Sequence, residues 1–289
     1  MTDDPFARHR GLLFTVAYEM LGSASDAEDV VQETWLRWAD VDHAEVRDAR
    51  AYLVRIVTRQ ALNRLRTSAR RREDYVGEWL PEPLLTSPDV AADVELAESV
   101  SMAMLTVLET LGPAERAVFV LREVFDAPYE EIAEAVGKSP AAVRQIAHRA
   151  REHVAARRPR VAVSADEQQE VVERFLAAVR GGDLQGLLDL MAPDVVLVAD
   201  GGGVVSAARR PITGAERVAA QIIRLPEVAG FAVAATTVNG AAAARVDIDG
   251  RLDTVVSLVV EGGRITRLYA VRNPEKLTAL DEAAALTRS

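Results

Sequence analysis

The segment from Tyr129 to Arg158 concentrates cationic and amide side chains at helical spacing. Its apolar residues predict two helices, with Gly137 ending the first, Lys138 filling the turn, and Ser139-Pro140 starting the second. The outer face of the second helix presents Arg144, Gln145, His148, Arg149 and Arg151. Because such groups match phosphates and major-groove base edges, the pattern predicts a helix-turn-helix that binds DNA. A solvated amphipathic helix is the alternative that this segment alone leaves open.

The net charge of −10 over 289 residues hides a strong segregation of charge along the chain. Residues 1–45 hold ten acids and three arginines, whereas residues 46–72 hold nine arginines and one acid. Residues 76–110 hold seven acids and no base, and arginines return between Arg144 and Arg160. An average this acidic argues against DNA binding, but two basic blocks separated by acidic surface predict two DNA contacts and a protein partner.

The composition also argues against several kinds of site. The chain has no cysteine, so disulfides and thiolate metal sites are excluded, and its four histidines lack the spacing of metal ligands. No apolar run approaches the length that spans a bilayer, and the acidic residues 1–4 lack the apolar core of a signal peptide. We therefore expect a cytoplasmic, nucleoid-associated protein that uses no metal and no cofactor.

Helical patterns cover the first 75 residues, which carry the acidic block and the first basic block. Ser25 and Glu28 have the spacing of a capping box and predict the start of one helix. An apolar stripe from Leu53 to Leu65 predicts a second helix over residues 49–72, whose other faces carry arginines. We therefore expect a first, all-helical domain over residues 1–75.

Prolines separate this domain from the helix-turn-helix. Pro81, Pro83 and Pro88 cannot continue a helix, so residues 76–91 are predicted to form an extended linker. Helical patterns then resume and continue to about Arg158, with breaks at Gly112-Pro113 and near Ala127-Pro128. Residues 92–160 are therefore predicted to be a second all-helical domain.

A change of pattern after residue 160 predicts a third domain over residues 161–289. Two amphipathic helices are expected over residues 168–180 and 184–191. Apolar runs separated by turns then predict strands at residues 195–198, 243–248, 252–260 and 264–271. Helices followed by such a meander are typical of an α+β domain.

Four motifs, in this order, resemble those of the group IV, or extracytoplasmic-function, sigma factors, which direct bacterial RNA polymerase to promoters. The run from Asp26 to Trp35 is similar to the region 2 helix that grips polymerase. The helix from Ala51 to Arg66 is similar to the one that melts and reads the upstream edge of the promoter bubble. Residues 111–116 and the helix-turn-helix resemble region 4, which reads the distal promoter element.

The remainder, about residues 162–280, resembles a SnoaL-like domain of the nuclear-transport-factor-two superfold. The implied fold class is therefore multidomain, with two all-α sigma domains (a region 2 helical bundle and a region 4 helix-turn-helix) followed by an α+β cone. The superfold packs a curved sheet on helices around a conical cavity, which leaves room for a small ligand. The other implied partners are promoter DNA and core RNA polymerase, through its beta-prime clamp helices and beta flap.

The resemblance also assigns roles to individual residues. Those implied to bind DNA are Arg59, Asn63, Arg64, Arg66, Lys138, Ser139, Arg144, Gln145, His148 and Arg149. Those implied to bind polymerase are Asp26, Asp29, Gln32, Glu33 and Trp35. An ordinary solvated face is the alternative for the acidic set, and simple solubilisation of a helix is the alternative for the first four DNA residues.

Sigma factors with this fusion share a linker, a glycine loop and a tail whose motifs recur here. The linker motif matches Trp79, Leu80, Pro81, Glu82, Pro83 and Leu84. The loop matches Asp200, Gly201, Gly202 and Gly203, and the tail matches Asn273, Pro274, Glu275, Lys276 and Leu277. Val204 replaces the lysine of the loop motif, which removes the cation that a salt bridge from this position to the acidic linker would need.

The sequence favours a sigma factor and not an enzyme. The third domain is expected to pack against the linker and to regulate the activity of the sigma factor in cis. One alternative is a bifunctional protein with a cyclase-like or isomerase-like third domain. That domain has no histidine or cysteine, so its general base would be Asp200, Asp247 or Asp253. We expect these three carboxylates to be solvated turn residues instead. The other alternative is a helix-turn-helix transcription factor that acts without polymerase.

Overall fold

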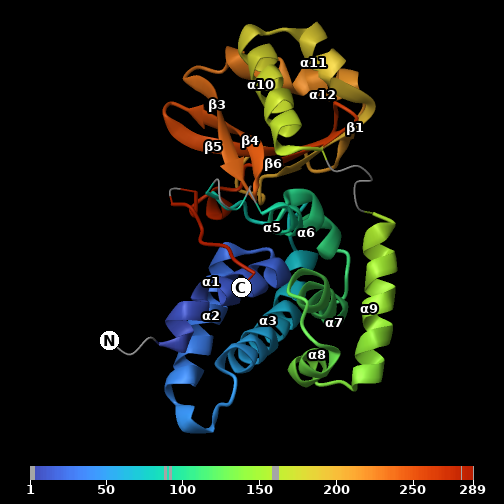
Figure 1. Cartoon of the computed structure of the whole chain (residues 1–289). Coiled ribbons are helices and arrows are strands. Elements are labelled where there is room, and N and C mark those ends of the chain that lie inside the picture. The colour runs from blue at the N-terminus through green and yellow to red at the C-terminus, as the bar shows by residue number, and fades with distance from the viewer. Residues whose placement is uncertain (1–3, 88–89, 91–92, 158–162, 281, 289) are drawn as a thin grey trace.

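The chain consists of a helical half and an α+β half stacked along one axis, with the linker running between them (Figure 1). The computed structural model describes residues 4–87, 90, 93–157, 163–280 and 282–288, so Arg158 and Arg160 of the second basic block and Pro88 of the linker lie outside the described residues. Within the described residues, no helix combines the length and the apolar character needed to cross a membrane.

The first part of the helical half is a bundle of helices α1 (Pro5–Leu21), α2 (Ala24–Ala39) and α3 (Ala49–Glu73). Helix α1 is buried along most of its length because it packs against both of the others and against the following domain. Helix α3 confirms the predicted arginine-rich helix, and its apolar stripe at Leu53, Val57 and Ala61 is fully buried.

Helix α2 begins earlier than the predicted capping box at Ser25 and Glu28. Its N-cap is Ser23, whose Oγ accepts a hydrogen bond from the amide of Asp26 at 3.1 Å. The carboxylate of Glu28 instead forms an ion pair with Arg10 on α1, at 2.6 Å. The capping-box prediction is therefore wrong, because Ser23 and not Ser25 is the N-cap, and the Glu28 side chain pairs with a residue of α1.

The second part of the helical half contains short helices that lead into the helix-turn-helix. These are α5 (Val94–Ser99), α6 (Met102–Leu108), α7 (Pro113–Phe119), the π-helical turn η2 (Val120–Val124), α8 (Tyr129–Val136) and α9 (Pro140–Ala155). Gly137 ends α8 in the left-handed region at φ 69°, and the Oγ of Ser139 caps α9 by accepting from the amide of Ala142 at 3.2 Å. The predicted helix-turn-helix is thus confirmed at its turn, but α9 ends at Ala155, so Arg157 lies just beyond the helix.

The α+β half is one mixed sheet with helices on one face. Its helices are α10 (Ala165–Gly181), α11 (Leu184–Leu190) and α12 (Ala215–Ile222). Its strands are β1 (Met191–Asp200), β2 (Ile212–Thr213), β3 (Phe231–Val238), β4 (Ala241–Ile248), β5 (Arg251–Glu261) and β6 (Arg264–Val271). The strand order is β2-β1-β6-β5-β4-β3, with β1 and β6 parallel and the other pairs antiparallel. The predicted α+β class of the third domain is confirmed.

The two faces of this sheet are covered by different parts of the chain. Apolar residues of α10, α11 and α12 fill the first face and form the internal core of the domain. The second face forms a separate apolar cluster in which Val255 and Tyr269 of the sheet pack with Leu80 of the linker and Met102 of α6. The helical half therefore supplies the cover for a sheet face that would otherwise be exposed.

Candidate nucleic-acid interface and interdomain dock

The outer face of α9 lies on the outside of the helical half and is open to solvent (Figure 1). The side chains of Arg144, His148 and Arg149 are 55%, 69% and 60% exposed, and Gln145 is exposed beside them. Arg144 pairs with Glu130 of α8 at 3.1 Å. Such exposed pairs contribute little to stability and can exchange for phosphate.

The turn before α9 also faces solvent. Lys138 is exposed, and Ser139 uses its hydroxyl oxygen to cap the helix. Its hydroxyl hydrogen remains available as a donor, because the cap needs only an acceptor. The predicted contacts at the front of α9 are therefore sterically accessible.

The predicted contacts on α3 are in a different situation, because α8 packs against this helix. Arg59 donates to the backbone oxygen of Glu134 at 2.8 Å, and Arg55 pairs with the Glu134 carboxylate at 3.1 Å. Arg55 was not among the predicted site residues, although it lies one helical turn before Arg59. The end of α8 thus occupies cations of the helix that is predicted to open DNA.

A cavity of about 220 Å³ opens beside these arginines. It is lined by Arg37, Tyr52, Arg55, Ile56, Arg59 and Gln60. The guanidinium of Arg55 lies 5.0 Å from the centre of the Tyr52 ring. A cationic, aromatic and amide lining of this kind can stack an unpaired base and neutralise its phosphate.

The predicted DNA cations and polymerase acids meet within the first bundle. Arg64 of α3 pairs with Asp29 at 2.5 Å and with Asp26 at 3.4 Å, both on α2. Gln60 donates to Glu33 at 2.7 Å. Sequence spacing alone could not reveal these pairings, because they join different helices.

Other predicted residues of this bundle are also open to solvent. Asn63 and Arg66 are exposed at 3.4 Å from one another on α3. Gln32 is exposed on α2, and Trp35 is 47% exposed, whereas the neighbouring Trp38 is buried. The exposed tryptophan gives α2 an apolar anchor beside its acids.

Asp200, at the end of β1, is completely buried and is not the solvated turn carboxylate that we expected. Its Oδ1 accepts from the hydroxyl of Tyr75 at 2.6 Å and from the amide of Gly202 at 3.0 Å. Its Oδ2 accepts from the amide of Leu80 at 2.9 Å and from Lys276 Nζ at 2.7 Å. The expectation fails because the linker lies over this turn and excludes water from it.

Lys276 supplies the cation that the glycine loop lacks. Its side chain is 7% exposed, and its Nζ donates to the backbone oxygen of Leu80 at 2.6 Å as well as to Asp200. The ammonium group also lies 4.0 Å from the ring centre of Trp79 and 4.8 Å from that of Tyr75. Val204, at the position of the motif lysine, is 60% exposed. Both backbone polar groups of Leu80 are therefore bound by the α+β domain.

The glycine loop is shaped by close approach to the tail. A Cβ on Gly202, which has φ 62°, would lie 2.3 Å from Asn273 Nδ2, and one on Gly203 would lie 3.0 Å from Val76. Asn273 in turn donates to the Tyr75 hydroxyl at 3.0 Å. Loop, linker and tail thus meet at one buried site, which we call the linker dock: Tyr75, Trp79, Leu80, Asp200, Gly202, Asn273 and Lys276.

Glu82 extends the linker contacts to the first bundle. Its carboxylate accepts from the amide of Ala24 and from the hydroxyl of Ser23, both at 2.7 Å. The negative charge of Glu82 also interacts favourably with the positive end of the α2 dipole. Pro81, Pro83 and Leu84 are buried beside it.

Asn239, in the turn between β3 and β4, is a buried interdomain residue that the sequence analysis missed. Its Oδ1 accepts from the amide of Leu84 at 3.1 Å, and its Nδ2 donates to the Tyr18 hydroxyl at 2.7 Å and to the Val100 oxygen at 2.8 Å. One side chain thereby joins the sheet, the linker, α1 and the chain after α5. The Asn239-Gly240 pair is a strong hairpin signal and could have marked this turn.

The remaining carboxylates considered for catalysis are held by arginines. Arg245 donates to Asp247 from Nε and from Nη2, at 3.0 and 2.9 Å. Arg272 holds Asp253 in the same bidentate manner, and its guanidinium keeps the pKa of that carboxyl below its ordinary value even though burial acts the other way. A carboxylate with a lowered pKa in a bidentate pair is a weak general base.

Comparison with known proteins agrees with this architecture. Residues 6–71 match the sigma-70 region 2 family and residues 101–154 match the sigma-70 region 4 family. The chain is 38% identical to the ECF RNA polymerase sigma factor SigJ of Mycobacterium tuberculosis, over 94% of this chain and 92% of that protein. It is 33% identical to the probable ECF RNA polymerase sigma factor SigI of the same species, over 94% of this chain and 93% of that protein.

The likeness extends to the third domain and to the overall structure. The crystal structure of the Mycobacterium tuberculosis extracytoplasmic function sigma factor SigJ superposes with a TM-score of 0.78 and 35% sequence identity. The superposition covers 96% of this chain and 98% of that one. The relatives therefore share the α+β domain as well as the two helical regions.

Proposed function

The chain belongs to the extracytoplasmic-function RNA polymerase sigma factors, and on that premise we propose that its α+β domain regulates promoter recognition in cis. The single observation that carries the proposal is the buried contact of Asp200 and Lys276 with the backbone of Leu80. This contact immobilises the linker between the two DNA-binding domains and so sets their relative placement. The domain thus does within one chain what a separate anti-sigma protein would do.

The sigma function itself requires core polymerase and promoter DNA as partners. The acidic face of α2 binds the beta-prime clamp helices, with Trp35 as an apolar anchor that is already exposed. Asp29 remains 59% exposed despite its pairing with Arg64, so it is free to meet a basic surface. Rim charges of this kind set association rate and specificity. The second helical domain binds the beta flap.

We propose that the two DNA contacts divide between α9 and α3 and that the protein acts at the nucleoid. The front of α9 reads the distal promoter element through Arg144, Gln145, His148 and Arg149, which face solvent. The cavity beside Tyr52 and Arg59 on α3 receives an unstacked base of the opened proximal element. Because Glu134 of α8 pairs with Arg55 and binds Arg59 through its backbone oxygen, we propose that full access of DNA to the α3 site requires the two domains to move apart.

We propose further that the α+β domain is not an enzyme. Each carboxylate that could act as a base is engaged: Asp200 by Lys276, Asp247 by Arg245, and Asp253 by Arg272. The sheet face opposite the helices is buried against the helical half and is not open to a substrate. Binding of a small ligand by this domain stays a prediction. Turnover of a substrate by the full chain, in a screen of isomerase and hydrolase substrates, would contradict the proposal that the domain is not an enzyme.

Run-off transcription with reconstituted polymerase tests the regulation. Asp200→Asn leaves Lys276 buried without its counter-ion, so we expect the linker to detach and the yield of promoter-specific transcript to change several-fold. Asp247→Asn is the matched control, because it removes a carboxylate from an arginine pair within strand β4. Equal transcription by Asp200→Asn and the parent chain would refute regulation through the linker dock.

Polymerase binding is tested separately. Replacing Asp29 and Glu33 with lysine should weaken association with core polymerase at physiological salt, while binding of DNA by α9 stays unchanged. Circular dichroism controls for the fold. Undiminished polymerase binding would place the clamp contact on another surface.

A further inference from the structure

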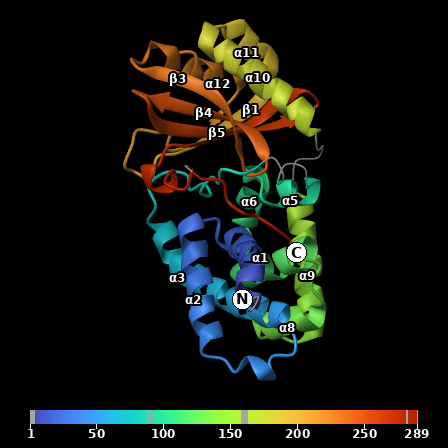
Figure 2. The same ribbon diagram turned by 60° about the vertical axis from the view of Figure 1, so that its left-hand side comes forward.

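Residues 284–288 leave the α+β domain and return to the helical half as an extended segment (Figure 2). Ala284 forms a parallel bridge with Thr86 of the linker, and its amide donates to the Leu85 oxygen at 2.8 Å. Leu286 is 8% exposed and belongs to the core of the helical half. The segment therefore completes an apolar surface that other elements build.

The same segment lies directly against α1. The amide of Thr287 donates to the Oγ1 of Thr15 at 3.0 Å. Gly11 makes room for this approach, since a Cβ there would lie 3.0 Å from the Thr287 side chain and 3.2 Å from the Ala285 oxygen. Glycine inside a helix lowers helix stability relative to alanine. Here its small size lets a second stretch of backbone reach the helix.

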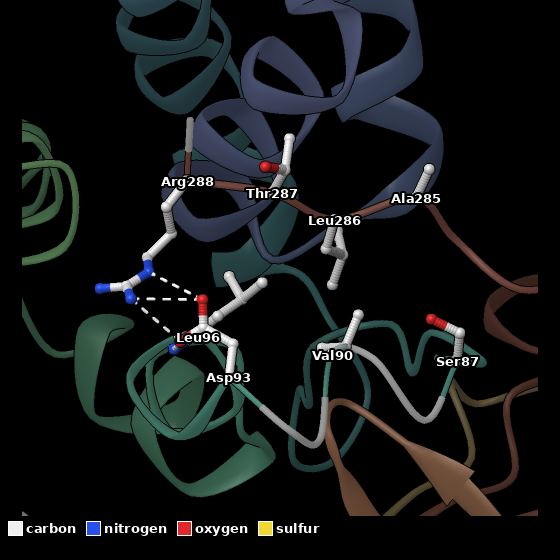
Figure 3. A pocket seen from close by; sticks show the side chains of 8 residues that line it. All are labelled: Ser87, Val90, Asp93, Leu96, Ala285, Leu286, Thr287 and Arg288. Carbon is white, nitrogen blue, oxygen red and sulfur yellow. Dashed lines mark hydrogen bonds and ion pairs between the residues drawn. The ribbon is translucent and has the colours of Figure 1, made fainter.

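Arg288 fastens the segment to α5. Its Nη2 lies 3.0 Å from Asp93 Oδ1 (Figure 3). Its Nη1 pairs with Glu95. Asp93 is also the N-cap of α5, where the same oxygen accepts from the amide of Leu96 at 3.1 Å. Arg288 thus engages the first turn of α5 through the residue that starts the helix.

The fit of the segment is incomplete. A cavity of about 480 Å³ lies next to it, lined among others by Leu286, Val90 and Leu96 (Figure 3). Close-packed surfaces leave few voids of this size, so the segment holds through Leu286, Thr287 and Arg288 instead of a continuous interface. An element with few buried contacts detaches at lower free energy than the cores on either side.

We propose that residues 284–288 are a releasable strap that fastens α1 to α5 and keeps the two DNA-binding domains together. The strap contacts α1, the linker and α5, so the domains separate only after one of these contacts breaks. It rests on the proposed regulation in cis, but it uses residues distinct from the linker dock. Releasing it lets α8 move away from Arg55 and Arg59 without disturbing the buried Asp200.

Distance measurements on the full chain test the strap. Because the chain has no cysteine, labels can be attached to cysteines introduced at the exposed residues Asp40, at the end of α2, and Ala155, at the end of α9. Leu286→Ala combined with Arg288→Ala should add a population at longer distance that the parent chain lacks. Gly11→Val should produce the same population with the strap sequence intact, because its side chain would occupy the place of Thr287.

Leu184→Ala combined with Arg251→Ala is the matched control, since both residues are exposed in the α+β half. It should leave the distance distribution unchanged. An unchanged distribution in both strap variants overturns the strap. If Asp200→Asn lengthens the distance in the same assay, the linker dock stands without the strap; if it does not, regulation through the dock fails as well.

Discussion

Helices α3 and α9 have the same chemistry but differ in what surrounds them. Each is an amphipathic helix with arginines on its polar side and an apolar stripe in the same continuous core. The cations of α9 pair with exposed acids of their own domain, as Arg144 does with Glu130, whereas Arg55 and Arg59 of α3 are held by Glu134 of the other domain and Arg64 is held by Asp26 and Asp29. Residue type therefore defines what a helix can bind, and packing between domains defines when it can bind.

The difference has a physical origin in the linker. Leu80, Glu82 and Leu84 are bonded in turn to Lys276, Ala24 and Asn239, so the linker contacts both halves of the molecule. A free linker of this length would let the two helical domains separate. Bound along its length, it leaves α8 in contact with α3.

The largest expected effect comes from breaking the buried pair. Lys276→Ala leaves Asp200 buried without its cation, which should destabilise the docked arrangement by about 3–5 kcal/mol. Trp79 reports the loss, because its ring stacks on the Lys276 ammonium, and denaturant unfolding followed by its fluorescence measures the change. Lys138→Ala, at an exposed lysine, should change stability by less than about 0.5 kcal/mol. Equal midpoints for the two variants would show that the pair does not stabilise the dock.

The second effect concerns α9 alone. Arg144→Ala should cost about 1–3 kcal/mol of DNA binding and relax the preference at one promoter position. Arg157, more than two turns further along, reaches only the backbone, so Arg157→Ala should weaken all sequences alike and reduce the salt slope by about one. Binding titrations over a promoter library measure both. If Arg144→Ala retains both the affinity for DNA and the sequence preference, α9 does not read DNA through this face.

The packed form, in which α8 lies against α3, should depend on pH. Glu19 of α1 is buried against Ser99, the last residue of α5, with its Oε1 2.8 Å from the Ser99 hydroxyl, and burial raises the pKa of its carboxyl to about 8. Arg288 opposes this shift only weakly from the strap. Since the raised pKa belongs to the packed form, that form binds a proton which the separated form, with an ordinary pKa near 4.5, releases.

The packed form should therefore be most favoured below pH 4.5 and should lose stability as pH rises from there to about 8. The loss approaches about 1.4 kcal/mol per pH unit within that window. Glu19→Gln keeps the contact with Ser99 but cannot ionise, so it should flatten the slope and stabilise the packed form at pH 8. Unfolding midpoints measured between pH 4.5 and about 8 test this prediction. If stability falls as steeply with pH in the variant as in the parent chain, other groups cause the pH dependence.

The smallest effect should follow from uncovering α3 directly. Glu134→Ala removes the carboxylate from Arg55 but leaves the backbone oxygen that binds Arg59. Exposed pairs of this kind contribute about 0–1 kcal/mol, so binding of single-stranded DNA to the full chain should strengthen by less than tenfold. Glu131→Ala on the same helix is the matched control. Equal binding by both variants would mean that Glu134 does not shield α3.

Much of this organisation could be predicted from local sequence. Gly137, Ser139 and Pro140 define the helix-turn-helix because caps and breaks depend on neighbours within one turn. The strand from Arg264 to Val271 was predicted with its observed bounds for the same reason. Strand β3 and helix α12 were missed. The run from Phe231 to Val238 contains strand-favouring phenylalanine, valine and threonine, but its three alanines and two adjacent threonines leave no clear alternation of apolar and polar residues.

The contacts of the linker dock were decided by tertiary structure. Resemblance indicated that linker, loop and tail belong together, but the Asp200 carboxylate and the Leu80 amide are 120 residues apart in the chain. Whether a carboxylate is solvated or buried depends on what folds over it, which no local pattern encodes. The sequence alone therefore predicted which helices bind DNA. Only the fold decided that one of them is covered, because covering requires two distant surfaces to meet.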